Sequence, residues 1–199
     1  MLSATIPSSY RKIRTATLAL TACALLVTLA ALPARAATPN VGDKAPDFAL
    51  KTPEGKSVSL HGLLKKGPVV LILLRGYPGY QCPYCQRQAH DFQVNAEKFA
   101  DKGVQLLLVY PGPAADLGEH AKEFLNGYEK LPTNYHLVLD PDYAMTRAYD
   151  LRWDAPRETA YPSTFVLNRN GVVTYRKISH THGDRTTADE ILGEFGKAI

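Results

Sequence analysis

Two nearly unbroken apolar runs constrain the fold of this chain more than any other feature. Residues 68–74 (PVVLILL) and 104–110 (VQLLLVY) contain no charged side chain, which is typical of central strands that are buried on both faces. Between them, residues 85–101 carry apolar side chains at helical spacing, namely Ala89, Phe92, Ala96, Phe99 and Ala100. The order strand, helix, strand predicts a βαβ unit with a parallel sheet at its centre.

Turn residues and hydrophobic patterns predict shorter elements on both sides of this unit. They are a β-hairpin (41–50 and 56–60, around the turn 52–55), helices (115–127, a turn or two at 142–149, and 187–198) and strands (135–139, 163–168 and 172–178). Asn170-Gly171 favours a hairpin between the last two strands, and Thr186 or Thr187 can cap the last helix. We therefore expect an α/β chain of thioredoxin-like fold, with a mixed central β-sheet, helices on both faces and an N-terminal β-hairpin.

Residues 1–36 have the three parts of an export signal. A basic stretch at 11–14 precedes the apolar run 15–32, and Ala34-Arg35-Ala36 forms a small-x-small cleavage site. We expect cleavage after Ala36, which would leave residues 37–199 as one thioredoxin-like domain in the periplasm or outside the cell, without stable membrane insertion. An uncleaved anchor is one alternative, because 18 apolar or small residues just reach the length that spans a bilayer. A lipoprotein attached through Cys23 is another.

The net charge of +4 also comes from this segment. The chain has 23 basic and 19 acidic residues, and residues 1–36 hold four of the basic ones and none of the acidic ones. The remainder is formally neutral. Nucleic-acid binding is not expected, because it needs a clustered excess of positive charge.

The mature chain would keep two cysteines, in Cys82-Pro83-Tyr84-Cys85. They lie where a buried strand gives way to a helix, and the N-terminus of a helix lowers the pKa of a thiol. Pro83 suits the first helical turn. A disulfide across two intervening residues closes too short a loop to stabilise a fold, so a redox role is expected for this pair. A zinc half-site is the alternative, and it would need two more ligands.

Several other residues are candidates to support the dithiol. In the thioredoxin fold a cis proline lies against the cysteines, and we expect Pro162 to form such a bond with Tyr161; an ordinary strand-opening proline is the alternative. Arg75 and Arg87 flank the dithiol and either lower the thiol pKa or are solvated. Tyr84, like Tyr77, is a candidate to cover the sulfurs.

From Val41 to about residue 178 the chain resembles the peroxiredoxin-like branch of the alkyl hydroperoxide reductase C/thiol-specific antioxidant (AhpC/TSA) family. The resemblance lies in VGDKAPDFAL, PVVLILLRGYPGYQCPYCQRQ and YPSTFVLNRNGVV. The family pattern P-x-x-x-[ST]-x-x-C matches at Pro78 and Cys85, with Cys82 in the place of the serine or threonine. The position of the family's peroxide-polarising arginine is occupied by Pro162.

The resemblance implies a thiol-based oxidoreductase with an antioxidant role, which reduces peroxides, disulfides or both through a Cys82–Cys85 dithiol/disulfide cycle. By alignment Cys85 holds the peroxidatic place; by comparison with thioredoxins Cys82 is the exposed attacking thiol and Cys85 resolves. Arg157 or Arg75 would have to substitute for the missing arginine. The expected partners are a peroxide or protein-disulfide substrate and an external, thioredoxin-like thiol donor, and no cofactor is required.

Other readings of the dithiol remain open. One is a periplasmic disulfide reductase without peroxidase activity. Another is a thioredoxin-fold copper chaperone in which the thiols and a distant histidine, His136 or His180, hold Cu(I), since soft thiolates suit that ion. A third is a binding module that keeps only the fold.

Overall fold

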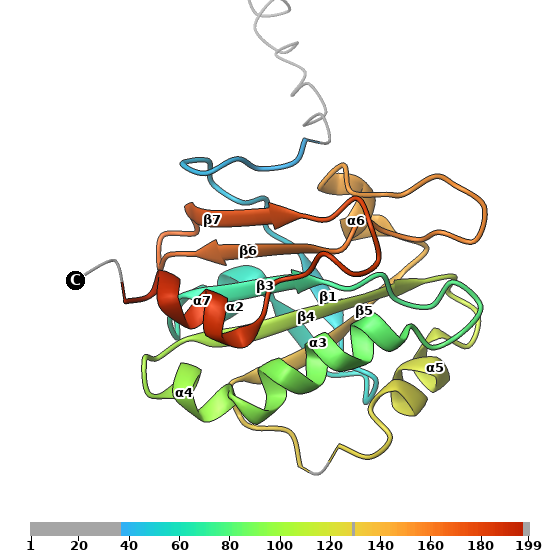
Figure 1. The fold of residues 1–199 in the computed structure, drawn as a ribbon, viewed down its shortest axis with the longest axis horizontal. Coiled ribbons are helices and arrows are strands. Elements are labelled where there is room, and N and C mark those ends of the chain that lie inside the picture. The colour runs from blue at the N-terminus through green and yellow to red at the C-terminus, as the bar shows by residue number, and fades with distance from the viewer. Residues whose placement is uncertain (1–36, 129, 197–199) are drawn as a thin grey trace, which may run out of the picture. The chain divides into compact units, whose positions relative to one another are not determined.

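A seven-stranded mixed sheet forms the centre of the chain (Figure 1). The computed structural model describes residues 37–128 and 130–196, so the expected signal segment 1–36 lies outside the described residues. The strands, in chain order, are β1 (Ala49–Lys51), β2 (Ser57–Ser59), β3 (Val69–Leu73), β4 (Gln105–Gly112), β5 (Tyr135–Pro141), β6 (Ser163–Leu167) and β7 (Val173–Ile178). Their order across the sheet is β2-β1-β5-β4-β3-β6-β7.

The sheet has the expected parallel centre and antiparallel edges. β3 pairs with β4, and β4 with β5, in parallel. β1 and β2 form the N-terminal hairpin at one edge, and β6 and β7 form the hairpin around Asn170-Gly171 at the other. The predicted α/β fold is confirmed by this arrangement.

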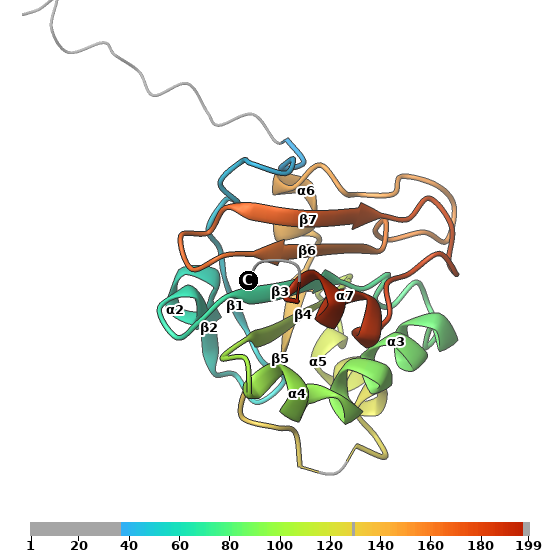
Figure 2. The same ribbon diagram turned by 60° about the vertical axis from the view of Figure 1, so that its left-hand side comes forward.

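Helices cover both faces of the sheet (Figure 2). They are α2 (Leu60–Leu64), α3 (Pro83–Val94), α4 (Ala96–Ala100), α5 (Leu117–Phe124), α6 (Ala144–Ala148) and α7 (Ala188–Glu194). Alternate residues of β3 point to opposite faces: Val70 and Ile72 pack with α3, α4, α5 and α7, whereas Leu71 and Leu73 pack with α2 and α6. This explains the unbroken apolar run, because every residue of β3 is buried. No described helix is long and apolar enough to cross a membrane.

Two expectations about local structure are wrong. The helix expected at 85–101 is split at Asn95, whose amide donates to the carbonyl of Asp91 at 2.9 Å and so competes with the helical pattern. The Tyr161–Pro162 peptide bond is trans, the form that most X-Pro bonds prefer. In that geometry the Pro162 carbonyl accepts from the backbone N–H of Ser179 at 2.8 Å, so Pro162 acts as a strand-opening residue.

Candidate active site

The two cysteines lie at the start of α3. Cys82 is the N-cap residue with extended backbone, Pro83 opens the helix, and Cys85 lies in its first turn. Both are free thiols, and only 2% of Cys82 and none of Cys85 is exposed. The expectation of an exposed Cys82 thiol is wrong, because both cysteines are part of the hydrophobic cluster between the sheet and α3.

The loop that leads to Cys82 is fixed against β4. Gly76 has φ +75°, and a Cβ on this residue would collide with the carbonyl of Pro111, so only glycine fits. Near the end of the loop, the hydroxyl of Tyr110 donates to the side-chain oxygen of Gln81 at 2.9 Å. These contacts determine where the chain enters α3.

The surroundings of Cys82 favour its thiolate. Its pKa is lowered to about 5, mainly by hydrogen bonding from the Cys85 thiol. Burial opposes the shift, while the backbone N–H groups of Cys85 and Tyr84 and the charge of Arg185 add to it. The sulfur makes no capping hydrogen bond within normal limits, so these N–H groups act as dipoles at the helix N-terminus rather than as close donors.

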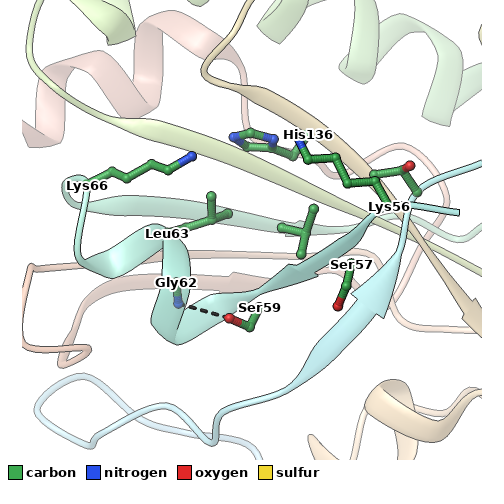
Figure 3. A pocket seen from close by; sticks show the side chains of 9 residues that line it. Lys56, Ser57, Ser59, Gly62, Leu63, Lys66 and His136 are labelled. Carbon is green, nitrogen blue, oxygen red and sulfur yellow. Dashed lines mark hydrogen bonds between the residues drawn. The ribbon is translucent and has the colours of Figure 1, made fainter. Parts of the chain in front are cut away.

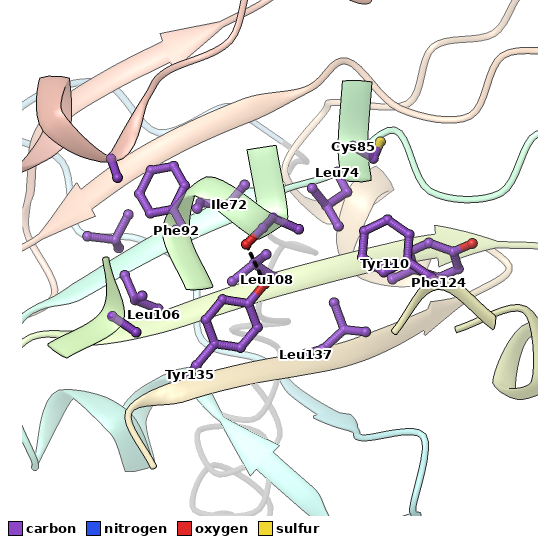
Figure 4. Packing of buried hydrophobic residues seen from close by; sticks show 14 of the residues in the cluster. Ile72, Leu74, Cys85, Phe92, Leu106, Leu108, Tyr110, Phe124, Tyr135 and Leu137 are labelled. Atoms are coloured by element: carbon purple, nitrogen blue, oxygen red, sulfur yellow. Dashed lines mark hydrogen bonds between the residues drawn. The ribbon is translucent and has the colours of Figure 1, made fainter. Parts of the chain in front are cut away.

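The surroundings of Cys85 disfavour its thiolate. Its pKa lies well above the ordinary value because the side chain is buried, and because a thiolate at Cys82 hydrogen-bonds to the Cys85 thiol. Figure 4 shows Cys85 next to Leu74 at the border of the hydrophobic cluster, which also contains Tyr110. The surroundings of the pair therefore favour a negative charge at Cys82 and a proton at Cys85.

Arg185 is the functional candidate that sequence reasoning missed. It lies in the β7–α7 connection, and its charge lowers the pKa of both thiols. Its Nε donates to the carbonyl of His182 at 2.7 Å and its Nη1 to the side-chain oxygen of Gln88 on α3 at 3.0 Å. Its Nη2 is buried and has no hydrogen-bond partner within residues 37–128 and 130–196. A single arginine 97 positions after Gln88 and outside any motif carries no signal that sequence reasoning can use.

Arg75, the predicted supporting arginine, is engaged elsewhere. It is 1% exposed, and its Nε pairs with the carboxylate of Glu158 at 2.6 Å. Its other two nitrogens donate to the hydroxyl of Tyr80 at 2.9 Å and to the carbonyl of Arg157 at 2.7 Å. The second carboxylate oxygen of Glu158 lies 3.0 Å from Nε2 of His182. Arg75 thus ties the dithiol loop to residues 157–158.

The other predicted residues differ in their burial. Tyr84 is 38% exposed, and the guanidinium of Arg87 lies 4.6 Å from the centre of its ring, so Arg87 contacts this ring. Pro162 is buried and lines a small hollow together with Arg185. Pro78 is half-buried in the loop before Cys82.

The described residues include no group of three or more histidine, cysteine, aspartate or glutamate side chains that could hold a metal ion. Within this part of the chain, the copper-chaperone alternative therefore has no histidine, aspartate or glutamate grouped with the two cysteines as a third ligand.

Comparison with known proteins agrees with the family resemblance noted in the sequence. The model of the AhpC/TSA family matches residues 41–176. The chloroplastic peroxiredoxin Q of Oryza sativa subsp. japonica is 32% identical over 165 residues, which cover 76% of this chain and 71% of the relative. That of Arabidopsis thaliana is 36% identical over 134 residues, which cover 67% of this chain and 57% of the relative.

Among solved structures, peroxidoxin BcpB from Mycobacterium tuberculosis has the same fold. It superposes with a TM-score of 0.63 at 22% identity, covering 81% of this chain and 99% of its own. Fold and family together make this protein a thiol-dependent peroxidase or thiol-disulfide oxidoreductase. The chain belongs to the AhpC/TSA family.

Proposed function

We propose that this protein is an exported thiol peroxidase in which Cys82 attacks the peroxide and Cys85 resolves. The observation that carries the proposal is the asymmetry of the two thiols. The pKa of Cys82 is lowered to about 5, whereas burial raises that of Cys85. The thiolate is the attacking form of cysteine, so at neutral pH Cys82 is the ready nucleophile. This favours Cys82 over Cys85, which alignment with the family pattern would place in the peroxidatic role.

In the first step the Cys82 thiolate attacks one oxygen of a hydroperoxide. An S–O bond forms while the O–O bond breaks, so Cys82 becomes a sulfenic acid and the other oxygen leaves, with a proton, as water or an alcohol. Arg185, whose charge lowers the pKa of Cys82 and whose Nη2 has no hydrogen-bond partner among the described residues, would donate to a peroxide oxygen. Arg185, rather than Arg75 or Arg157, then fills the role of the arginine that Pro162 replaces.

In the second step Cys85 attacks the sulfenic sulfur of Cys82. Water leaves and the Cys82–Cys85 disulfide forms, which completes a two-electron oxidation of the dithiol. An external thiol donor of the thioredoxin type then reduces the disulfide by thiol–disulfide exchange. Neither step requires a metal or an organic cofactor.

The burial of Cys82 supports a small substrate. Because only 2% of this residue is exposed, a hydroperoxide reaches the sulfur with less rearrangement than a disulfide held in a folded protein. Disulfide reduction is the second candidate, and it is favoured by Cys82 standing where the family has serine or threonine. In that route the Cys82 thiolate displaces one substrate thiolate to form a mixed disulfide, and Cys85 displaces the other.

The export part of the proposal depends on residues 1–36, whose basic, apolar and small-x-small parts are those of a cleaved signal. A mass spectrum of the protein from a secreting host should give a chain that begins at Ala37. A chain that keeps residues 1–36, or one that is lipidated at Cys23, would contradict cleavage after Ala36.

Stopped-flow kinetics test the chemistry. We expect the reduced wild-type protein to consume hydrogen peroxide in a fast, single-turnover phase and to reduce insulin disulfides more slowly. A protein that ignores peroxide but reduces insulin would establish the disulfide-reductase alternative. A protein whose reduced thiols react with neither would contradict both.

A further inference from the structure

We propose that a second site, formed by Lys56, Lys66 and His136, binds a small oxyanion of the phosphate type. It lies at the amino ends of β3 and β5, whereas the dithiol follows the carboxyl end of β3, so it does not depend on the proposed function. The site is a hollow of about 220 Å³. Its lining consists of Thr52, Lys56, Ser57, Val58, Ser59, Gly62, Leu63, Lys66 and His136.

The charge of this hollow is positive and uncompensated. Figure 3 shows the side chains of Lys56 and Lys66 extending toward the His136 ring from opposite sides. None of the nine lining residues is acidic, and within residues 37–128 and 130–196 neither ammonium group forms an ion pair. Two cations that converge without a counter-charge attract an anion with two negative charges.

The electrostatics of His136 agree with this arrangement. The pKa of His136 is lowered to about 4, mainly by burial and then by the charges of Lys66 and Lys56, in that order of size. No acidic side chain raises it. The imidazole is therefore neutral at physiological pH, with its Nε2 3.2 Å from the side-chain oxygen of Gln105. A bound anion would supply the negative charge that the site lacks.

Thr52 belongs to the same lining. Its hydroxyl oxygen is buried and has no hydrogen-bond partner among the described residues. A buried hydroxyl without a partner is unfavourable, and an anion oxygen within reach would accept its hydrogen bond. The Oγ of Ser59 accepts from the N–H of Gly62 at 3.0 Å, so its proton is still free to donate. The donor groups of the lining are thus the two ammonium groups and the hydroxyls of Thr52, Ser57 and Ser59.

The size and the floor of the hollow favour a small ligand. Val58 and Leu63 supply apolar side chains below the charged groups, and the space is that of a compact ion rather than a chain. Inorganic phosphate and the phosphate of a small ester present the same oxygens. We therefore assign the site to the phosphate group itself and leave its carrier to experiment.

Isothermal titration calorimetry with inorganic phosphate, at constant ionic strength set by chloride, tests the proposal on the full mature protein. We expect saturable binding and a shift of the His136 ring resonances in NMR spectra. The K56Q/K66Q double variant should bind at least about tenfold more weakly, since hydrogen bonds to charged groups are among the stronger ones. A parallel titration with glycerol phosphate distinguishes a phosphate ester from free phosphate as the preferred ligand.

The matched control is K65Q, which removes a neighbouring exposed lysine that does not line the hollow. It should bind phosphate like the wild type. An equal loss in K65Q and the double variant, or no saturable binding by the wild type, would overturn the site. Thermal unfolding of each variant shows whether it is folded. Peroxide turnover should be unchanged in the folded double variant, so the dithiol chemistry and the anion site can fail independently.

Discussion

The two ends of the central strands each place positive charge beside a titratable side chain, with opposite consequences. At the carboxyl end, Arg185 helps to lower the pKa of Cys82, which turns a neutral thiol into an anion that the arginine offsets. At the amino end, Lys56 and Lys66 reinforce the effect of burial on His136, which keeps the imidazole neutral and leaves both lysine charges unopposed. The same electrostatic effect thus favours a nucleophile at one end and an anion-attracting hollow at the other.

Exchange of the cysteines tests the carboxyl end most severely. Cys82→Ser should lower peroxide turnover by several orders of magnitude, because loss of the nucleophile removes the covalent step. Cys85→Ser should still consume one equivalent of peroxide and stop at a sulfenic acid at Cys82, which dimedone labelling with mass spectrometry detects. If instead Cys82→Ser keeps the fast phase and Cys85→Ser loses it, the family alignment identifies the nucleophile correctly and the asymmetry of the pair does not.

Arg75 sharpens the comparison, because it is a buried cation at the same end that pairs with a carboxylate instead of a thiol. Glu158→Gln should destabilise the protein by about 3–5 kcal/mol, since it leaves a buried charge without its partner, and should leave the pKa of Cys82 nearly unchanged. Chemical denaturation measures the free energy of unfolding. The control is Glu119→Gln, which breaks an exposed pair with Lys122 of 2.7 Å and should change the stability little, because solvent screens such pairs. Equal losses of stability in the two variants would show that the buried Arg75–Glu158 pair stabilises the protein no more than an exposed pair does.

The sheet and the dithiol could be predicted from the sequence because both depend on short-range patterns. The apolar runs that became β3 and β4, the Asn170-Gly171 turn, and the spacing of Cys82 and Cys85 are local in the chain and have direct physical meaning. Their prediction needed no knowledge of which loops meet.

The position of Arg185 and the hollow lined by Lys56, Lys66 and His136 depend on contacts between distant segments. Arg185 reaches α3 from the β7–α7 connection, and Lys56 meets His136 only because the N-terminal hairpin pairs with β5. The contact of the Pro162 carbonyl with the backbone N–H of Ser179 on the returning chain is likewise long-range. Comparison with thioredoxins predicted an exposed Cys82. This prediction is wrong because packing around the start of α3 buries the sulfur.

Arg185→Gln should move the titration of Cys82 to higher pH without abolishing the reaction. Removal of the positive charge raises the Cys82 pKa above its value of about 5. Each unit of increase lowers the thiolate fraction about tenfold at pH values below the pKa. The pH dependence of iodoacetamide alkylation measures this shift, and peroxide kinetics show any additional loss. Arg185→Lys should recover part of the thiolate, and Arg87→Gln, which removes a cation that contacts Tyr84, should leave the profile unchanged. A profile that moves equally in Arg87→Gln would mean that general surface charge, and not Arg185, sets the thiol pKa.

The smallest expected effect lies at the amino end, where the charges are exposed. His136 has a pKa of about 4 in the folded protein, below its ordinary value, so the unfolded chain binds the proton more readily. Its contribution to stability is present above about pH 6.5 and is lost as the pH falls toward 4. In K56Q/K66Q the pKa of His136 should rise, though burial, the larger cause, keeps it below the ordinary value, and the loss of stability on acidification should shrink. An NMR titration of the His136 ring and denaturation at pH 7 and pH 4.5 measure the two quantities, with K65Q as the control. An unchanged His136 titration in the double variant would mean that the lysine charges do not reach the ring, and the contrast between the two ends of the sheet would fail.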